Sequence, residues 1–470
     1  MSKEYILTFT EEQHLALKAH FYAGDGKEGV AFAVCGQCEG AKRHRLLVQE
    51  IIIVPNDSCS FRSDCAVTWS TDLIEPLLDK IEGKRLSVVK IHNHPNGLSS
   101  FSEVDDQSDS ALLSALNGYL ENEVPHGSAI MLANGHMFGR IWDKTNEFIS
   151  LTSINVVGDD LHYWYSNQCE RGECDFTASH AQLFGKGTTE RLRELSVAIV
   201  GCSGTGSPLA EQLARLGVKR LTLIDDDIIE ARNVNRIYNS TMDDVEAGKK
   251  KVELIKCALD RIGIETDINA IPYNLWDPRS VKAVAECDIV FGCMDSVDGR
   301  YLLNFIATYY MLPYFDIGIR LEADPTGLEQ GAIREVCGTI HYLQPGRSSL
   351  VSRGLFSMDD VSSAGLRRVD PQAYSTQEAE GYISGVVETS PAVISVNTLG
   401  ASLAVNELLS RLHPYREEGN SEYSQVIFSL SSMEIFGEPE DNSCLMFRDK
   451  VGVGDITPLL GMPELSVRSR

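Results

Sequence analysis

Residues 196–227, SVAIVGCSGTGSPLAEQLARLGVKRLTLIDDD, indicate the architecture of the larger part of this chain. A short apolar run leads into a glycine-rich turn, a segment with helical periodicity follows, and a second apolar run ends in three aspartates. This order is typical of a βαβ unit, and similar units continue to about residue 295. We therefore predict an α/β fold with a doubly wound parallel sheet covered by helices on both faces.

The turn GCSGTGS carries Gly201, Gly204 and Gly206 in the order GxxGxG, whereas the nicotinamide dinucleotide fingerprint has the order GxGxxG. Small residues at the start of a helix let backbone amides approach phosphate oxygens. The next apolar run ends in Asp225 and Asp227, where a carboxylate can accept hydrogen bonds from ribose hydroxyls. The pattern indicates a nucleotide site at the carboxyl ends of the strands.

Residues that offer polyphosphate, metal and ribose partners follow downstream: Asn233, Arg236, Lys251 and, at the end of another apolar run, Asp295. Together with the glycine turn, the segments NVNR, KKKVE and MDS resemble the ThiF/MoeB/ubiquitin-activating superfamily over most of residues 180–412. Members of this superfamily adenylate the C-terminal glycine of ubiquitin-like proteins. The resemblance implies a Rossmann-like domain that uses ATP and Mg²⁺.

The same resemblance implies a role for each residue. Asp225 would bind ribose and Asp295 would position magnesium. The phosphates would be held by Asn233, Arg236 and Lys251. A carboxylate that attacks the α-phosphate needs the charge on the leaving pyrophosphate neutralised, which suits arginine, lysine and Mg²⁺. The implied partner is the C-terminal tail of a ubiquitin-like protein, and the implied assembly is a homodimer through this domain.

A second group of residues, HNHPNGLSSFSEVD, follows the apolar run LSVVKI near the N-terminus. His92 and His94 stand two apart on a predicted strand, so their side chains share one face. Ser102 is a predicted helix N-cap and Asp105 follows one turn later, where its carboxylate could join the imidazoles on one ion. Three protein ligands with an open fourth position are typical of catalytic zinc, which lowers the pKa of bound water to about 7.

This segment is similar to the HxHPxxxxxxSxxD signature of JAB/JAMM (MPN-type) metallopeptidases, which cleave ubiquitin-like proteins from their adducts. The zinc ligands implied by this resemblance are His92, His94 and Asp105. Ser102 would stabilise the oxyanion, and Glu28, just ahead of an early apolar strand, would be the general base. Glu50 also precedes an apolar strand and remains an alternative base.

Three segments account for the 470 residues: 1–146 as a JAB/JAMM-like domain, 147–194 as connector and entry segment, and 195–470 as the adenylation domain. Apolar residues make up 43% and charged residues 23%, as in an average soluble globular chain. The formal net charge of −25 would repel nucleic acid and anionic membranes, so we expect neither as a partner. We expect a cytoplasmic protein, because neither a signal peptide nor a bilayer-spanning run is apparent and the twelve cysteines are dispersed.

Two features of the superfamily are altered here. Many relatives have an arginine before the FG of their entry segment, which reaches ATP across the dimer, but this chain has Ser179. Arg191 or Arg193 could substitute, although a role on the surface of a helix is the more common one. Many relatives also bind structural zinc through a CxxC after a PG turn, where this chain has Ser349 and Ser352. We therefore expect no second zinc site.

A covalent thioester is also weakly indicated, because residues 338–443 contain no cysteine. Cys337 and Cys202 are the nearest candidates, and a structural role is the more common one for both. Adenylation without a thioester would pass the acyl group to a sulfur donor or a conjugating enzyme, or to a serine or threonine within 346–390.

The two resemblances together predict a bifunctional enzyme. The peptidase would expose a C-terminal glycine on a ubiquitin-like protein, and the second domain would adenylate it. By analogy, the setting is an anti-phage system or a sulfur-carrier pathway. The alternatives are a binding module in which one site is inactive and a nicotinamide oxidoreductase with an accessory metal site.

Overall fold

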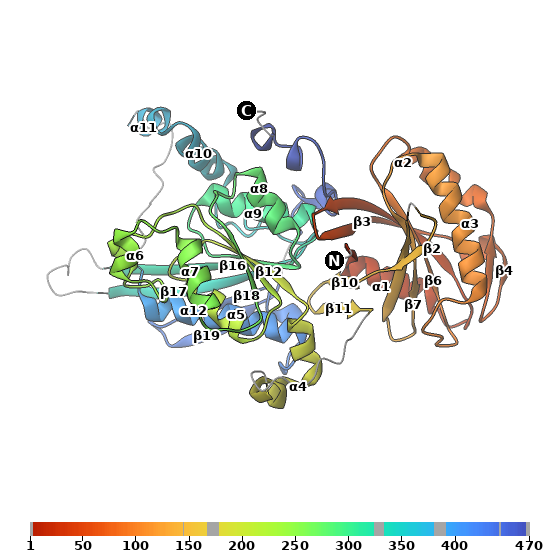
Figure 1. Ribbon diagram of the computed structural model, residues 1–470, viewed down its shortest axis with the longest axis horizontal. Coiled ribbons are helices and arrows are strands. Elements are labelled where there is room, and N and C mark those ends of the chain that lie inside the picture. The colour runs from red at the N-terminus through yellow and green to blue at the C-terminus, as the bar shows by residue number, and fades with distance from the viewer. Residues whose placement is uncertain are drawn as a thin grey trace. The chain divides into compact units, whose positions relative to one another are not determined.

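The computed structural model describes residues 3–143, 145–166, 178–323, 333–379, 392–440 and 443–466. The chain divides into two compact units (Figure 1). The first comprises Met1–Glu170, Tyr309–Met311 and Val451–Ile456. The second comprises Arg171–Thr308, Leu312–Lys450 and Thr457–Arg470.

The first unit is built on a nine-stranded sheet with the order β11-β10-β1-β3-β2-β6-β7-β8-β9. Its strands are β1 (Glu4–Thr10), β2 (Val30–Glu39), β3 (Arg43–Ile53), β6 (Ser87–Asn93), β7 (His126–Met131), β8 (Met137–Trp142), β9 (Phe148–Ser150), β10 (Ser153–Val157) and β11 (Leu161–Tyr165). A separate hairpin joins β4 (Cys59–Arg62) to β5 (Val67–Trp69). The helices of this unit are α1 (Glu11–Phe21), α2 (Glu75–Ile81) and α3 (Glu103–Leu120).

Strand β2 separates two cores, one on each face of this sheet. Ala31 and Ala33 pack with residues of α1, whereas Phe32 packs with residues of α2 and α3. Successive side chains of a strand point to opposite faces, so α1 covers one face and α2 with α3 covers the other. Because both faces of the sheet are covered here, β2 is buried over nearly its whole length and its sequence is mostly apolar.

The helix starts in this unit follow local capping rules. A capping box of Thr10 and Gln13 starts α1, and Ser102 caps α3 as predicted. The helical segment after Ser70 begins with a 3₁₀ turn, and α2 starts at Glu75. The separate turn arises because the Ser70 hydroxyl accepts from the amide of Asp72 and caps the short turn.

The segment predicted as a connector, 147–194, contributes strands to the first sheet. Strand β10 pairs in parallel with β1 and antiparallel with β11. All five residues of β10 are buried, and the run SINVV alternates polar and apolar residues over its first four positions, a short strand signal that the connector interpretation did not use. The end of the same segment forms α4 (Ala178–Leu192) in the second unit.

The second unit contains an eight-stranded sheet with the order β14-β13-β12-β15-β16-β17-β18-β19. Its strands are β12 (Ser196–Val200), β13 (Arg220–Ile224), β14 (Asp267–Ile271), β15 (Ile289–Gly292), β16 (Tyr314–Ala323), β17 (Ile333–Leu343), β18 (Gln425–Ser429) and β19 (Glu434–Glu438). The first five in spatial order are parallel and the last three pair antiparallel. The predicted doubly wound α/β fold is confirmed.

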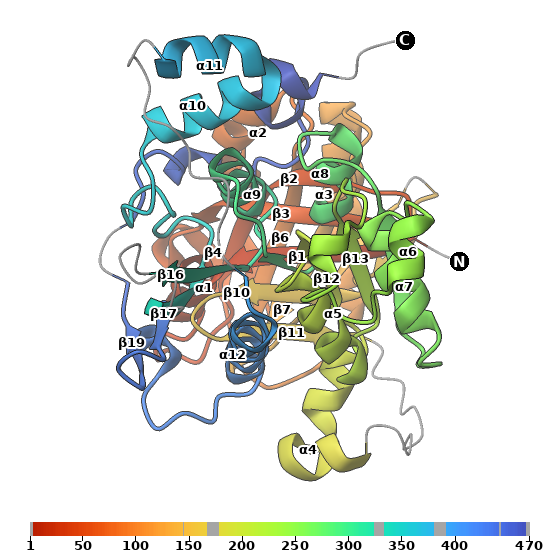
Figure 2. The same ribbon diagram turned by 90° about the vertical axis from the view of Figure 1, so that its left-hand side faces the viewer.

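Helices cover both faces of the second sheet. Besides α4, the helices of this unit are α5 (Gly206–Arg215), α6 (Met242–Glu246), α7 (Lys251–Asp260), α8 (Pro278–Ala285), α9 (Val297–Tyr309), α10 (Met358–Val369), α11 (Pro371–Ala379) and α12 (Ile394–Leu412). Helices α8 and α9 lie on one face, and α5 and α12 lie on the other (Figures 1 and 2). None of the helices within the described ranges is long and apolar enough to cross a membrane.

Two further segments of the second unit pack in defined ways. Residues 346–379 contain α10 and α11, which lie side by side (Figures 1 and 2). Gly400 of α12 lies against the sheet of its own unit, since a Cβ there would come within 2.7 Å of Ile319 Cδ1. Gly400 thus lets α12 pack closely on β16.

Candidate functional sites

The glycine-rich turn between β12 and α5 leaves no room for a side chain at its first and last glycines. A Cβ on Gly206 would lie 2.0 Å from the carbonyl oxygen of Gly201, and one on Gly201 would lie 2.6 Å from that of Cys293. Gly201 also has a φ of +92°, which favours glycine. The Arg236 side chain lies against Gly204, where an added Cβ would come within 3.1 Å of Arg236 Cδ. The turn therefore brings backbone amides and a guanidinium to the start of one helix.

Asp225, directly after β13, anchors this turn through hydrogen bonds. Its Oδ2 accepts from the Cys202 amide at 2.7 Å, and its Oδ1 accepts from the Asp227 amide at 2.9 Å. Burial raises the pKa of the Asp225 carboxyl, and the positive charge of Lys251 opposes this rise. Lys251, the first residue of α7, donates to Asp227 Oδ2 at 2.5 Å. The structure thus brings the predicted ribose and phosphate residues together.

Asn233 and Arg236 lie on and after a 3₁₀ turn that follows β13. The buried side chain of Asn233 accepts from the Glu230 amide at 3.1 Å, so part of its role is to shape this turn. The Arg236 guanidinium donates to the Arg232 carbonyl at 2.7 Å. Asn233 is therefore a positioning residue in this geometry, while Arg236 borders the glycine turn.

Asp295 lies three residues beyond the end of β15, in the loop before α9. Removal of surrounding water raises the pKa of the Asp295 carboxyl, and Arg300 and Arg236 oppose this rise. Asp295 is outside the Asp225–Asp227 group, whose carboxylate oxygens lie within 4.8 Å of one another. Asp295 therefore lies within the electrostatic influence of Arg236, on the side of the site away from the three aspartates that follow β13.

Sequence reasoning missed three residues near this site. Arg300 Nε donates to Asp316 Oδ1 at 3.0 Å, and the Tyr314 hydroxyl donates to the same oxygen at 2.7 Å. Asp316 is fully buried on β16, in register with Gly292 of β15. A charged residue inside the apolar run YFDIG was the available signal, because buried carboxylates require partners.

Asn397, on α12, was also missed. Its Nδ2 donates to Thr205 Oγ1 at 2.9 Å, and it lies beside Gly204. Its Oδ1 is buried and has no hydrogen-bond partner among the described residues. A buried acceptor of this kind at the glycine turn fits a site that receives a polar ligand.

The fold and these side chains are compatible with ATP and magnesium. The glycine turn offers backbone amides at a helix N-terminus, Asp225 borders the end of β13, and Lys251 and Arg236 supply positive charge. This is the switch-point location at which doubly wound sheets bind ligands, since β13 and β15 flank β12 on opposite sides.

In the first unit, three predicted metal ligands converge. His92 Nε2 lies 3.1 Å from His94 Nε2 and 3.1 Å from Asp105 Oδ1, and His94 Nε2 lies 3.6 Å from Asp105 Oδ2. Two ligands of one tetrahedral zinc stand about 3.3 Å apart when each bond is about 2.0–2.1 Å. The spacing and the chemistry of the donors therefore fit a single zinc ion.

Neighbouring groups orient these ligands. His94 Nδ1 lies 2.7 Å from the Leu98 carbonyl and donates to it, which directs the lone pair of Nε2 toward the other ligands. Ser102 Oγ donates to Asp105 Oδ2 at 2.7 Å. Burial disfavours the charged form of Asp105, but hydrogen bonds with His92 and His94 outweigh it and hold the pKa of the carboxyl far below its usual range.

Glu28 and Glu50 lie in different surroundings. Val30 pairs with His92, so continuing the antiparallel register by two residues places Glu28 opposite His94. Burial raises the pKa of Glu28 to about 7, and the positive charge of His94 opposes this rise. Glu50 instead pairs with Lys80 at an exposed position. The structure therefore favours Glu28 as the base.

The structure also describes the positions at which this chain differs from the superfamily pattern. Ser179 is exposed on α4, and Arg191 donates to the Leu412 carbonyl at 2.6 Å, at the end of α12. Ser349 and Ser352 are joined by hydrogen bonds, the Ser349 amide donating to Ser352 Oγ at 2.8 Å. Arg191 therefore secures a helix end in this structure, and the serine pair closes the turn itself.

Neither candidate thiol is activated. Burial raises the pKa of the Cys202 thiol well above its usual value, and the negative charge of Asp225 adds to this effect. Burial also raises the pKa of Cys337, on β17. The helix N-terminus near Cys202 thus does not lower its pKa. Residues 383–387, ISGVV, lie outside the described residues.

Comparison with known proteins defines the class of the second unit. Residues 177–444, more than half of the chain, match the ThiF family model, and the chain belongs to that family. Ubiquitin-like modifier-activating enzyme 5 of Culex quinquefasciatus is 27% identical over 270 residues, or 54% of this chain and 64% of that protein. Adenylyltransferase and sulfurtransferase MOCS3 of Mus musculus is 37% identical over 114 residues, or 24% of each chain.

The chain spans about half to two thirds of the length of the first curated relatives. Among solved structures, E. coli MccB with ATP has a TM-score of 0.43 and 20% identity, covering 60% of this chain and 75% of that chain. Membership of the ThiF family argues against the nicotinamide oxidoreductase alternative. The family match does not extend into residues 1–176.

Proposed function

We propose that the second unit adenylates the C-terminal carboxylate of a ubiquitin-like protein, using ATP. The observation that carries this proposal is the convergence of the glycine turn, Asp225, Lys251 and Arg236 in a ThiF family domain. The names of two relatives support this substrate class, since one activates a ubiquitin-like modifier and the other is an adenylyltransferase and sulfurtransferase. A sulfur-carrier protein is the alternative substrate.

In this reaction, a carboxylate oxygen of the terminal glycine attacks the α-phosphorus, and the bond to the pyrophosphate oxygen breaks. Arg236 and Lys251 neutralise charge on the phosphates, and backbone amides of the glycine turn hydrogen-bond phosphate oxygens. Asp225 accepts hydrogen bonds from ribose. Magnesium, positioned by Asp295, would neutralise further charge on the leaving pyrophosphate.

ATP–pyrophosphate exchange tests this activity. The purified full chain is mixed with ATP, Mg²⁺ and a ubiquitin-like protein that ends in glycine. We expect Asp295→Asn to lower exchange at least 100-fold, whereas Asp243→Asn, on the exposed surface of α6, leaves it unchanged. Normal exchange by Asp295→Asn would contradict the magnesium assignment, and no partner-dependent exchange by the wild type would favour a binding module.

We further propose that the first unit is a zinc peptidase of the JAB/JAMM type that processes or removes the same ubiquitin-like protein. The supporting observation is the His92, His94 and Asp105 cluster with Glu28 opposite it. Zinc held there would supply Lewis-acid activation of water and of the scissile carbonyl. Glu28 would accept a proton from the attacking water and pass it to the leaving amine.

The structure gives Ser102 a contact that the sequence alone does not indicate. Its hydroxyl already donates to Asp105 Oδ2, so in this arrangement Ser102 orients the metal-binding carboxylate. Contact with an oxyanion requires the hydroxyl to turn away from Asp105. We propose that Ser102 first positions Asp105 and donates to the oxyanion only when substrate is bound.

Zinc content and cleavage test the peptidase. We expect one zinc per chain by elemental analysis, at least tenfold less in Asp105→Asn, and full content in Asp79→Asn on α2. A substrate with a short C-terminal extension, followed by intact mass spectrometry, should lose the extension before an adenylate mass appears. A wild-type chain that binds no zinc would overturn this part of the proposal without affecting adenylation.

The assembly of the adenylating unit is part of the same proposal. We propose a homodimer through the second unit, as the superfamily resemblance implies, and either a conjugating enzyme or a sulfur donor as the next acyl acceptor. Light scattering of the full chain, expected at twice the 51.8 kDa monomer mass, tests the dimer. A monomer mass at micromolar concentration would contradict it.

A further inference from the structure

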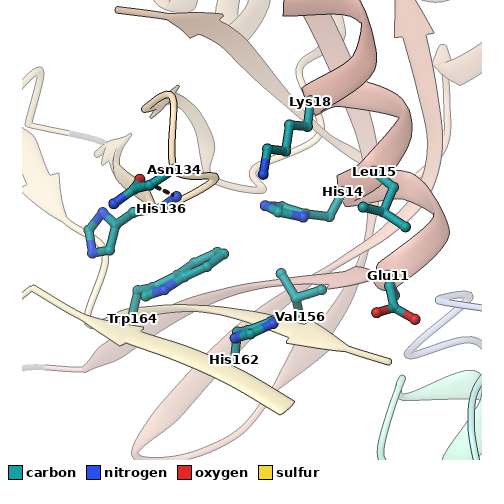
Figure 3. A pocket seen from close by; sticks show the side chains of 9 residues that line it. All are labelled: Glu11, His14, Leu15, Lys18, Asn134, His136, Val156, His162 and Trp164. Carbon is teal, nitrogen blue, oxygen red and sulfur yellow. Dashed lines mark hydrogen bonds between the residues drawn. The ribbon is translucent and has the colours of Figure 1, made fainter. Parts of the chain in front are cut away.

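A cavity of about 290 Å³ in the first unit lies outside both sites described above (Figure 3). It is lined by residues of α1, of the turn between β7 and β8, and of β10 and β11. Its polar and aromatic lining includes His14, Lys18, Asn134, His136, His162 and Trp164. A cavity of this size can hold a molecule of one or two rings.

The walls of this cavity are aromatic. The ring centroid of Trp164 lies 5.4 Å from that of His14, 5.4 Å from that of His136 and 5.7 Å from that of His162. The imidazoles surround the indole and do not converge on one point. Within the described residues they form no group whose donor atoms lie within 4.8 Å of one another, so a metal site is not indicated.

The polar groups of the cavity favour an anion. Among the described residues, no hydrogen-bond or ion-pair partner faces the Lys18 ammonium, which points into the cavity (Figure 3). Glu11, the nearest lining acid on α1, accepts from the Asp159 amide at 3.3 Å, and its side chain lies away from Lys18 in Figure 3. The positive charge of Lys18 is therefore not neutralised within the cavity.

Two further polar atoms are available on the opposite wall. Asn134 Oδ1 accepts from the His136 amide at 2.9 Å, which leaves the side-chain NH₂ of Asn134 able to donate. His136 Nδ1 is buried without a hydrogen-bond partner among the described residues. Burial lowers the pKa of both His14 and His136, so these imidazoles are neutral at pH 7 and Lys18 is the cation.

We propose that this cavity binds a small planar aromatic acid. Its ring packs against Trp164 and the surrounding imidazoles, and its carboxylate pairs with Lys18 and accepts from the Asn134 amide. Charged hydrogen bonds inside an aromatic cavity would distinguish an acid from a neutral molecule of the same shape. Binding in this cavity is independent of either enzymatic activity.

The test is isothermal titration of the full chain with three acid and amide pairs of matched shape. The pairs are benzoate and benzamide, nicotinate and nicotinamide, and indole-3-acetate and indole-3-acetamide. We expect at least one acid to bind ten times more tightly than its amide, and to change the fluorescence of Trp164. If none of the three acids binds, or if acid and amide bind equally, the proposal is wrong.

Variants identify the groups responsible. Lys18→Gln should abolish the preference for the acid, whereas Lys84→Gln, the same change at an exposed lysine of the first unit, should retain it. Trp164→Leu should weaken acid and amide alike by at least tenfold. If Trp164→Leu is unfolded by circular dichroism, Trp164→Phe should give a smaller weakening of both. A Lys18→Gln protein that keeps the acid preference would overturn the assignment.

Discussion

At the scale of single residues, the two candidate bases differ in their electrostatic surroundings. Glu28 is 5% exposed, opposite His94, and its backbone is fixed on both sides by the β4–β5 hairpin. The Glu28 amide donates to the Ser63 carbonyl at 2.7 Å, and Arg62 Nε donates to the Glu28 carbonyl at 2.7 Å. Glu50 lies within β3, where it pairs with Val34 of β2, and its side chain pairs with Lys80 at the surface.

This contrast predicts the effect of removing each carboxylate. Glu28→Gln should lower peptidase turnover by about 100-fold or more, because the amide cannot accept the proton, while zinc content and adenylation stay normal. Glu50→Gln should cleave at the wild-type rate. The measurement is the initial rate of release of a C-terminal extension. A loss confined to Glu50→Gln would reverse the assignment of the base.

Glycines provide a second prediction at this scale. Gly206→Ala should lower the free energy of unfolding by about 1–3 kcal/mol and abolish ATP binding, because its Cβ would lie 2.0 Å from the Gly201 carbonyl oxygen. Gly365→Ala, inside α10 with nothing within 4 Å, should raise stability by up to about 1 kcal/mol. Urea unfolding and ATP titration measure both. Unimpaired ATP binding by Gly206→Ala would show that the turn can relax.

At the scale of elements, a buried ion network fixes α3 against β6 and β8. Asp109 of α3 is fully buried and accepts from Lys90 Nζ at 2.8 Å and from Arg140 Nη2 at 2.9 Å. Lys90 precedes His92 by two residues on β6, and Asp109 follows Asp105 by about one helical turn. The network therefore sets the helix position that brings Asp105 to the histidines.

Removing the central charge should uncouple these elements. Asp109→Asn leaves the buried Lys90 without its counter-charge and leaves Arg140 with only the half-exposed Asp106, so we expect a loss of about 3–5 kcal/mol of unfolding free energy and weaker zinc binding. Asp106→Asn removes only the half-exposed partner of Arg140 and should cost less than about 1 kcal/mol. Chemical denaturation of the two variants makes the comparison. Equal losses would mean that the buried network does not hold α3.

At the scale of the whole molecule, buried histidines make stability depend on pH. Burial lowers the pKa of His44 and of His126, both in the first unit, to about 4. The His126 Nδ1 accepts from the Val88 amide at 2.9 Å, which a protonated ring cannot do. In the unfolded chain each ring has its usual pKa of about 6.5, so the unfolded state binds more protons between pH 6.5 and 4.

Acid should therefore destabilise the first unit. The contribution of each histidine is fully present above about pH 6.5 and is lost as the pH falls toward 4, by up to about 3 kcal/mol for each ring. His126→Asn keeps an acceptor for Val88 but does not titrate, so its unfolding free energy should fall less over this range. Urea titrations at several pH values measure the slopes. Identical slopes for wild type and His126→Asn would contradict the assignment.

Local features of this protein were readable from the amino-acid sequence alone. The βαβ alternation with its glycine turn, the capping residues Thr10 and Ser102, and the spacing of His92 and His94 all depend on neighbours within a few residues. Short-range periodicity and capping can be recognised in a single chain because their physical cause lies in the same segment. Strand β10 was missed because its alternating run, SINVV, is only five residues long and its partners β1 and β11 are visible only in the folded sheet.

Which distant residues meet became clear only from the folded arrangement. The β2–β6 register placed Glu28 rather than Glu50 opposite His94, and the β15–β16 register brought Asp316 beside the nucleotide site. Burial raises the pKa of the Cys202 thiol, because desolvation outweighs the effect of the nearby helix N-terminus. Pairing across a sheet and exclusion of water depend on segments far apart in the chain, and no local pattern records them.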